Sequence, residues 1–137
     1  MLREIACIYG LVYDPLLIIP VTLLIASLGK TTYDMVKILV ATWLLELLVH
    51  VAKYNIPSVR PCQELGLNCC PSTNDIPSGH AALGMFHGLL LYNMGYRYES
   101  MFFFLQGVSR YVGKQHSAVA IMLGSVMGAV WYHLMFG

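Results

Sequence analysis

Five apolar segments alternate with shorter polar stretches along the chain. They cover residues 5–28, 35–54, 80–94, 100–112 and 118–136. A helix needs roughly 20 predominantly apolar residues to cross a bilayer, and most of these segments approach that length. The segment 100–112 is the shortest. The pattern predicts an all-α integral membrane protein, with a bundle of about five transmembrane helices in a single domain over residues 1–137.

The first segment is interrupted by Tyr13, Asp14 and Pro15. Proline breaks a helix, and a carboxylate is costly in lipid. We expect one crossing with a break; a short lead-in followed by a helix over 16–28 is the alternative. Asp14 is interpreted as an interfacial N-cap before Pro15 rather than as a catalytic group.

Composition supports the membrane interpretation. Hydrophobic residues make up 58% of the chain and charged residues 11%, with a mean hydropathy of +0.65. Charged residues make up about 25% of an average soluble domain. The net charge of +1 and the lack of a basic cluster argue against nucleic-acid binding.

Three of the four cysteines, Cys62, Cys69 and Cys70, share the polar loop 55–75. They suggest a disulfide if this loop faces an oxidising compartment. Zinc binding is the alternative, although adjacent cysteines without a nearby histidine do not make a standard zinc site, so no metal is expected. Cys7 is expected to be a buried free thiol. The loop itself shows no helical or strand periodicity.

The loop turns into the third apolar segment at Pro77-Ser78-Gly79-His80. Ser78 is a good N-cap, and the free amide groups of the first helical turn lie beside the imidazole of His80. An anion site is one interpretation of this stretch. An ordinary transition from loop to helix is the other.

Helix parity brings the remaining polar groups to the same membrane interface. If the chain crosses five times, the ends of the second and fourth helices and the starts of the third and fifth lie at one face of the membrane. We therefore expect five polar groups at that face: Lys53, Arg60, His80, Arg110 and His116. Three cations and two imidazoles suit an anion with several oxygens, such as a phosphate or diphosphate. One histidine can attack phosphorus while the other protonates the leaving oxygen.

Glu46 and His50 lie one helical turn apart on the face that leads to Lys53. They form either a buried structural pair or a supporting part of the site. His87 is interpreted as a hydrogen-bonded core residue. An ion or proton pathway over Glu46, His50 and His87 is a third alternative.

These residues carry a resemblance to a known family. The relevant motifs are Lys53 followed by six residues and Arg60-Pro61, then Pro77-Ser78-Gly79-His80, then Ser109-Arg110 followed by five residues and His116. Their order and spacing resemble the three-part signature of the type 2 phosphatidic acid phosphatase superfamily. The resemblance covers about half of the chain, residues 53–124, and Gly124 falls where the family often has a glycine.

The resemblance implies a metal-independent lipid phosphatase that needs no cofactor. It assigns phosphate binding to Lys53, Arg60 and Arg110, with further contacts from Ser78 and Gly79. It also makes His80 the general acid and His116 the nucleophile. The implied substrates are phosphatidate, phosphatidylglycerol phosphate or a polyprenyl or dolichyl diphosphate. Usual members have six helices, one more than expected here.

One position departs from the family pattern. The usual third motif has an aspartate four residues after the nucleophilic histidine, and this chain has Ala120 there. Loss of an orienting carboxylate lowers the rate of comparable enzymes by several powers of ten. A backbone carbonyl, a water or Glu46 could serve His116 instead. The alternative function is therefore a catalytically impaired relative that binds anionic headgroups or is a structural subunit of a membrane complex.

Basic residues outside the site indicate its side of the membrane. Arg3 and Lys114 lie at the site end, and Lys30, Lys37 and Arg97 at the other. Basic residues favour the cytoplasmic side. Together with the cysteine loop, this bias predicts a multi-pass protein whose site is extracytoplasmic or luminal.

Overall fold

The computed structural model describes residues 1–13, 17–67 and 70–137, and within these ranges the regular structure is entirely helical. The elements in chain order are α1 (Leu2–Tyr9), the short 3₁₀ helix η1 (Gly10–Tyr13), α2 (Ile18–Ala26), α3 (Thr32–Asn55), α4 (Pro61–Glu64), α5 (Gly79–Asn93), α6 (Arg97–Val112) and α7 (Ala118–Phe136).

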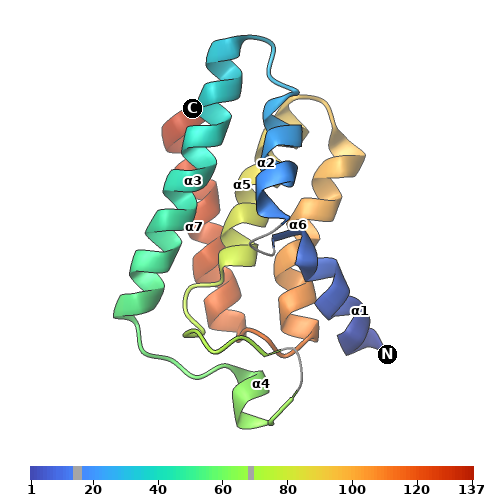
Figure 1. Ribbon diagram of the computed structural model, residues 1–137, viewed down its shortest axis with the longest axis vertical. Coiled ribbons are helices and arrows are strands. Elements are labelled where there is room, and N and C mark those ends of the chain that lie inside the picture. The colour runs from blue at the N-terminus through green and yellow to red at the C-terminus, as the bar shows by residue number, and fades with distance from the viewer. Residues whose placement is uncertain (14–16, 68–69) are drawn as a thin grey trace.

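Helix α5 lies in the middle of the bundle and packs against α6, α7 and α3 (Figure 1). Helices α2 and α3 pack together, and α1 lies against α6. The segment between α3 and α5, described over 56–67 and 70–78, covers one end of the bundle and contains α4. We call this segment the cap. It lies over the end of α3, the start of α5, the end of α6 and the start of α7.

Two helices, α3 with 24 residues and α7 with 19, are long and apolar enough to cross a membrane among those the structure describes. Their outward surfaces expose apolar side chains such as Leu47 on α3 and Val126 on α7, each 58% exposed. The predicted bundle of five transmembrane helices is not confirmed. The first apolar segment divides into α1, η1 and α2; α1 and α2 have only eight and nine residues, so neither matches the thickness of a bilayer alone. Asp14 and Pro15 lie outside the described residues.

Side-chain caps set the starts of the main helices. Thr31 and Asp34 form a capping box, so α3 begins at Thr32, three residues before its predicted start. Ser78 caps α5 as predicted, accepting a hydrogen bond from the amide of Ala81 at 3.2 Å. Ser117 caps α7 through the amide of Ala120, also at 3.2 Å.

Glycines allow α5 and α7 to pack closely, as the small residues of both segments predicted. A Cβ added at Gly124 would collide with the carbonyl oxygen of Ser78, and one at Gly128 with that of Ala82. The Ser78 amide also donates a hydrogen bond of 3.0 Å to the Ala120 carbonyl. The starts of the two helices are therefore held together beside the cap.

The cap contains one short helix that the sequence did not indicate. Loop 55–75 was expected to lack regular structure, but α4 begins at Pro61, a favourable first position of a helix. Cys62 and Cys70 form a disulfide, as the cysteine spacing suggested, and the Cys62 amide donates a 2.7 Å hydrogen bond to the Lys114 carbonyl. The prediction that Cys7 is a free thiol is wrong, since Cys7 is disulfide-bonded.

Candidate functional site

A cavity of about 220 Å³ lies beneath the cap and is lined by all five groups that helix parity predicted to share one interface. Lys53 comes from the last turn of α3, Arg60 from the residue before α4, and His80 from the first turn of α5. Arg110 comes from the last turn of α6, and His116 precedes α7. Four separate helix ends and the cap thus supply the site.

Arg60 is 3% exposed and is held in a fixed orientation by hydrogen bonds. Its Nε donates to the Thr73 carbonyl at 2.8 Å and its Nη2 to the Thr73 hydroxyl at 2.7 Å. Its Nη1 donates to the Gln115 carbonyl at 2.9 Å and to Nε2 of His116 at 3.1 Å. Burial lowers the pKa of Arg60 to about 10, so this side chain stays charged at neutral pH. Arg60 therefore forms a preorganised wall of the cavity next to His116.

Arg110 is 5% exposed and is oriented by groups distant in sequence. Its Nη2 donates to the carbonyls of Ala6 at 2.6 Å and Cys7 at 3.3 Å, and its Nη1 donates to the side-chain oxygen of Gln115. Its Nε is buried without a hydrogen-bond partner among the described residues. A buried donor is costly to leave unpaired, so this position favours an acceptor in the cavity.

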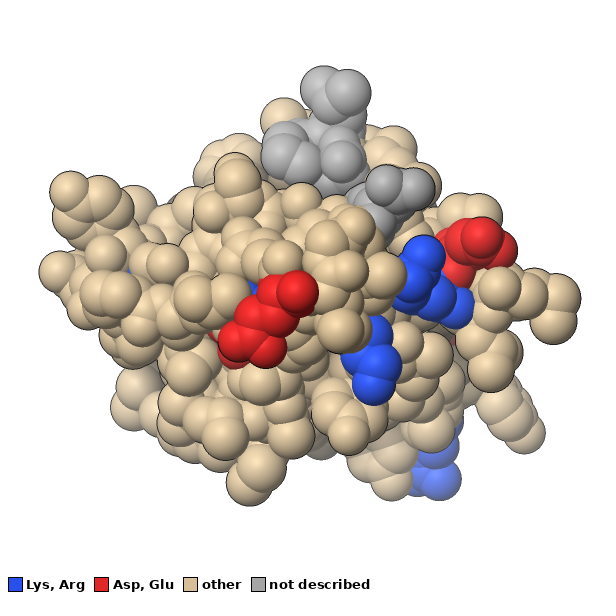
Figure 2. Space-filling model, turned by 90° about the horizontal axis from the view of Figure 1, so that it is seen from below, with Lys and Arg blue, Asp and Glu red and all other residues tan. Residues whose placement is uncertain are grey.

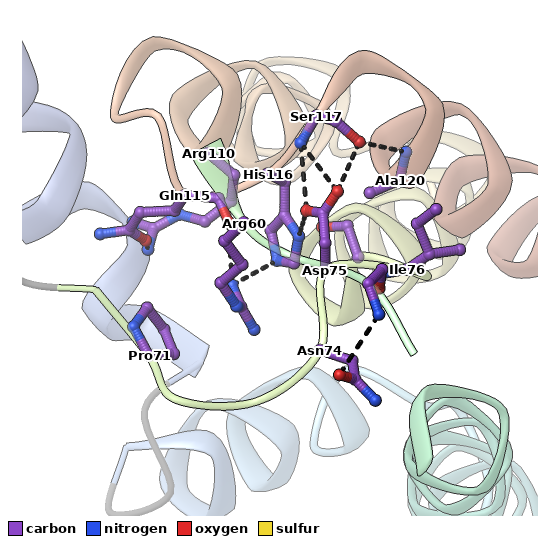
Figure 3. A network of polar contacts seen from close by, with 12 residues as sticks. Arg60, Pro71, Asn74, Asp75, Ile76, Arg110, Gln115, His116, Ser117 and Ala120 are labelled. Carbon is purple, nitrogen blue, oxygen red and sulfur yellow. Dashed lines mark hydrogen bonds and ion pairs between the residues drawn. The ribbon is translucent and has the colours of Figure 1, made fainter. Parts of the chain in front are cut away.

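His116 lies between Arg60 and Asp75 (Figure 3). Its Nδ1 is 2.9 Å from Oδ1 of Asp75, and its Nε2 is the atom that faces Arg60. Because a guanidinium only donates, Nε2 must accept and Nδ1 must carry the proton. Burial, followed by the charges of Arg60 and Lys53, lowers the pKa of His116 to about 2, against the opposing effect of Asp75. The ring is therefore neutral, with a lone pair on Nε2.

Asp75 was not among the site residues predicted from the sequence. Its side chain is 3% exposed, and its two oxygens also accept hydrogen bonds from the Ser117 amide at 3.1 Å and the Ser117 hydroxyl at 2.5 Å. The prediction considered carboxylates in α7 and α3, whereas Asp75 comes from the cap, five residues before His80. The signal in the sequence is an acidic residue two positions before the Pro77-Ser78-Gly79-His80 stretch, in a chain poor in acidic residues.

His80 and Gly79 line the cavity, but Ser78 does not. The His80 ring packs edge-on against the ring of Tyr13, with centroids 5.8 Å apart. Ser78 is fully buried and its hydroxyl caps α5, so the structure gives it a role in placing His80 instead of a direct contact with a ligand.

Glu46 and His50 both line the cavity on the α3 side. They do not form the buried pair that was one interpretation of their spacing, because His50 is exposed; its Nδ1 bonds to the backbone carbonyl of Glu46 at 2.8 Å. Glu46 does not contact His116, whose Nδ1 is occupied by Asp75. Glu46 therefore does not replace the absent aspartate as the partner of His116.

His87 is the hydrogen-bonded core residue that was predicted. It is fully buried, with Nδ1 2.8 Å from the Tyr13 hydroxyl and Nε2 3.1 Å from the Thr42 hydroxyl. Both ring nitrogens thus have partners within the bundle. This arrangement gives no support to a proton pathway through His87.

A second cavity of about 310 Å³ adjoins the first and shares His50, Lys53 and Thr73 with it. Tyr54, Ser72 and Asn74 complete its lining. Viewed from the cap end, the surface carries only scattered charges of both signs (Figure 2). Three of the eight basic residues, Lys53, Arg60 and Arg110, line the cavity instead.

The described residues contain no group of three or more His, Cys, Asp or Glu side chains arranged to hold a metal ion. The cavity is instead lined by three cations, by the imidazoles of His50, His80 and His116, and by the carboxylate of Glu46, while the buried carboxylate of Asp75 contacts His116. Such a set can bind a multiply charged oxyanion and present a neutral imidazole to it. Comparisons with protein-family models, curated proteins and solved structures found no match to this chain.

Proposed function

We propose that this chain is a metal-independent membrane phosphatase that hydrolyses a lipid phosphate or diphosphate through a phosphohistidine on His116. The observation that carries the proposal is the convergence of three cations and two histidines, from separate elements, on one cavity. The unpaired Nε of Arg110 adds support, since a phosphate oxygen would give this buried donor an acceptor. The three-motif resemblance supplies the same assignment of roles.

In the proposed reaction, Lys53, Arg60 and Arg110 bind the phosphate oxygens. A phosphate oxygen takes the Nη1 hydrogen bond of Arg60 in place of His116 Nε2, and the Nε2 lone pair is then free to attack phosphorus. The bond from phosphorus to the leaving oxygen breaks, and His80 donates a proton to that oxygen. His80 then takes a proton from water, which attacks phosphorus, breaks the phosphorus–nitrogen bond and releases inorganic phosphate.

A lipid substrate is proposed because the cap end adjoins a bundle with an apolar exterior. The first cavity can hold one phosphate group, and the adjoining cavity offers hydroxyl and amide groups beside Lys53. That second space suits the next phosphate of a diphosphate or the polar part of a headgroup. The proposed location of the site is extracytoplasmic or luminal, in agreement with a disulfide in the cap.

The test is phosphate release by the purified protein from phosphatidate, phosphatidylglycerol phosphate and polyprenyl diphosphates, with EDTA present. His116→Ala should abolish release. The matched control is His133→Ala, which removes an exposed histidine at the opposite end of α7 and should leave release unchanged. If the wild type releases no more phosphate than His116→Ala on every substrate, the enzyme proposal fails. Headgroup binding without turnover would then support the impaired relative.

A further inference from the structure

We propose that Asp75 is the positioning residue for the nucleophile His116, so that catalysis does not depend on a carboxylate in α7. The inference rests on the proposed function for its catalytic consequence. Its structural part, a carboxylate that holds the Nδ1 proton of His116, can be tested separately. It implies that Ala120 does not mark an inactive protein.

The first argument is the direction of the hydrogen bonds around the ring. Arg60 can only donate to Nε2, and an ionised carboxylate can only accept from Nδ1. The two contacts therefore select one tautomer, in which the lone pair lies on the nitrogen that faces the cavity. The ring is held from both sides before any ligand binds.

The second argument is the way in which Asp75 is itself held. The side chains of Asp75 and His116 are 3% and 1% exposed, so water does not compete for their contact. The Ser117 hydroxyl donates to Asp75 and accepts from the Ala120 amide. The group that caps α7 thus fixes the carboxylate as well, and the carboxylate, His116 and the start of α7 form one connected unit.

The third argument comes from the charge that develops in the reaction. When Nε2 forms its bond to phosphorus, the ring keeps its Nδ1 proton and becomes a cation. Asp75 then lies 2.9 Å from a positively charged ring instead of a neutral one, and the pair is buried, which strengthens the attraction. No proton transfer to Asp75 is required, because the carboxylate only compensates the charge of the phosphohistidine.

Position 120 does not take part in this unit through its side chain. Ala120 is fully buried, and its backbone is already used: its amide bonds to Ser117 and its carbonyl accepts from Ser78. The carboxylate at Nδ1 thus comes from the cap segment that precedes His80, where the resemblance would place it in the helix that follows His116. Ala120, fully buried, lies where the starts of α5 and α7 meet.

The experiment compares Asp75→Asn with Glu64→Gln, which neutralises an exposed carboxylate on the same cap. Asp75→Asn should lower kcat by roughly 10²- to 10⁴-fold with little change in KM, as the loss of an orienting carboxylate does elsewhere. Inhibition by inorganic phosphate should persist, because Lys53, Arg60 and Arg110 remain. Glu64→Gln should match the wild type. If Asp75→Asn also loses phosphate inhibition, the carboxylate builds the whole site and the positioning role is overturned.

A spectroscopic measurement does not depend on turnover. In protein labelled with ¹⁵N-histidine, the His116 signal, identified by its absence in His116→Ala, should show a proton on Nδ1 that is strongly deshielded. This proton signal should move upfield in Asp75→Asn and stay in place in Glu64→Gln. A proton on Nε2 in the wild type, or no shift in Asp75→Asn, would overturn the proposal. A shift without phosphatase activity in the wild type would instead refute the proposed function and leave the pairing intact.

Discussion

Replacing Gly124 by alanine should test whether close packing of α5 and α7 sets the geometry of the site. Gly124 lies against the carbonyl of Ser78, the residue that caps α5 two positions before His80. Gly128→Ala is the matched control, because its added Cβ would collide with the Ala82 carbonyl in the same way, one turn further from the cap.

The expected effect follows from the size of a methyl group. Carbon atoms pack at roughly 3.5–4.0 Å, whereas the new Cβ at position 124 would be 3.1 Å from the Ser78 carbonyl carbon and closer still to its oxygen. The two helices must separate locally, and overpacking of this kind costs about 1–3 kcal/mol of stability. A displacement of about 1 Å between catalytic groups can lower a rate by about 100-fold.

Thermal unfolding and phosphate release should be measured for both variants in the same detergent. Both should unfold at similarly lower temperatures, while Gly124→Ala should lose much more activity because His80 and His116 are the groups displaced. Equal activity loss in the two variants would show that the rate follows general stability. An unchanged rate in Gly124→Ala would refute the claim that this contact sets the distance between the histidines.

Three further predictions follow from the cap and from His116. Ala120→Asp should not raise the rate of phosphate release, because Asp75 already occupies Nδ1 of His116, and it should lower the Tm, because position 120 is fully buried. The double variant Cys62→Ala/Cys70→Ala removes a disulfide that joins residues eight apart, and denaturant unfolding should show a loss of about 2.5 kcal/mol from the smaller entropy of a closed loop. Finally, the pKa of His116 is lowered from 6.5 to about 2. Between these two pH values, His116 binds a proton in the unfolded chain but not in the folded protein. The free energy of unfolding should therefore fall as the pH drops below about 6.5, and His116→Asn should show a shallower decline between about pH 7 and pH 4.

The helices that contain an uninterrupted apolar pattern could be predicted well from the sequence. The predicted range 118–136 is that of α7, and the range 80–94 is shifted by one residue from α5. The start of α3 was placed late because Thr31 and Asp34, which form its capping box, belong to the polar stretch before the apolar segment 35–54. The first segment was harder: the sequence indicated one crossing with a break, whereas the described residues form α1, η1 and α2, of which α1 and α2 have only eight and nine residues.

The site could be predicted where parity and spacing were sufficient. Lys53, Arg60, His80, Arg110 and His116 line one cavity as expected, since each lies at a helix end or in the cap.

The partners of these groups could not be predicted. Asp75 reaches His116 across 41 residues, and Arg110 reaches the Ala6 carbonyl across 104. Neither contact leaves a periodic pattern in the sequence, because each depends on how the cap and α1 fold over the bundle.

Asp75 and His80 lie five positions apart on one short segment, so this segment connects the partner of one histidine to the other histidine. Asp75 holds His116, the proposed nucleophile, and His80 is the proposed acid. The length of this segment thus sets the distance between the two histidine side chains, His116 and His80. A residue inserted or deleted between Asp75 and Ser78 would change the register of both at once, whereas the exposed turn of the cap around Gly66 could accept a change of length without altering that spacing.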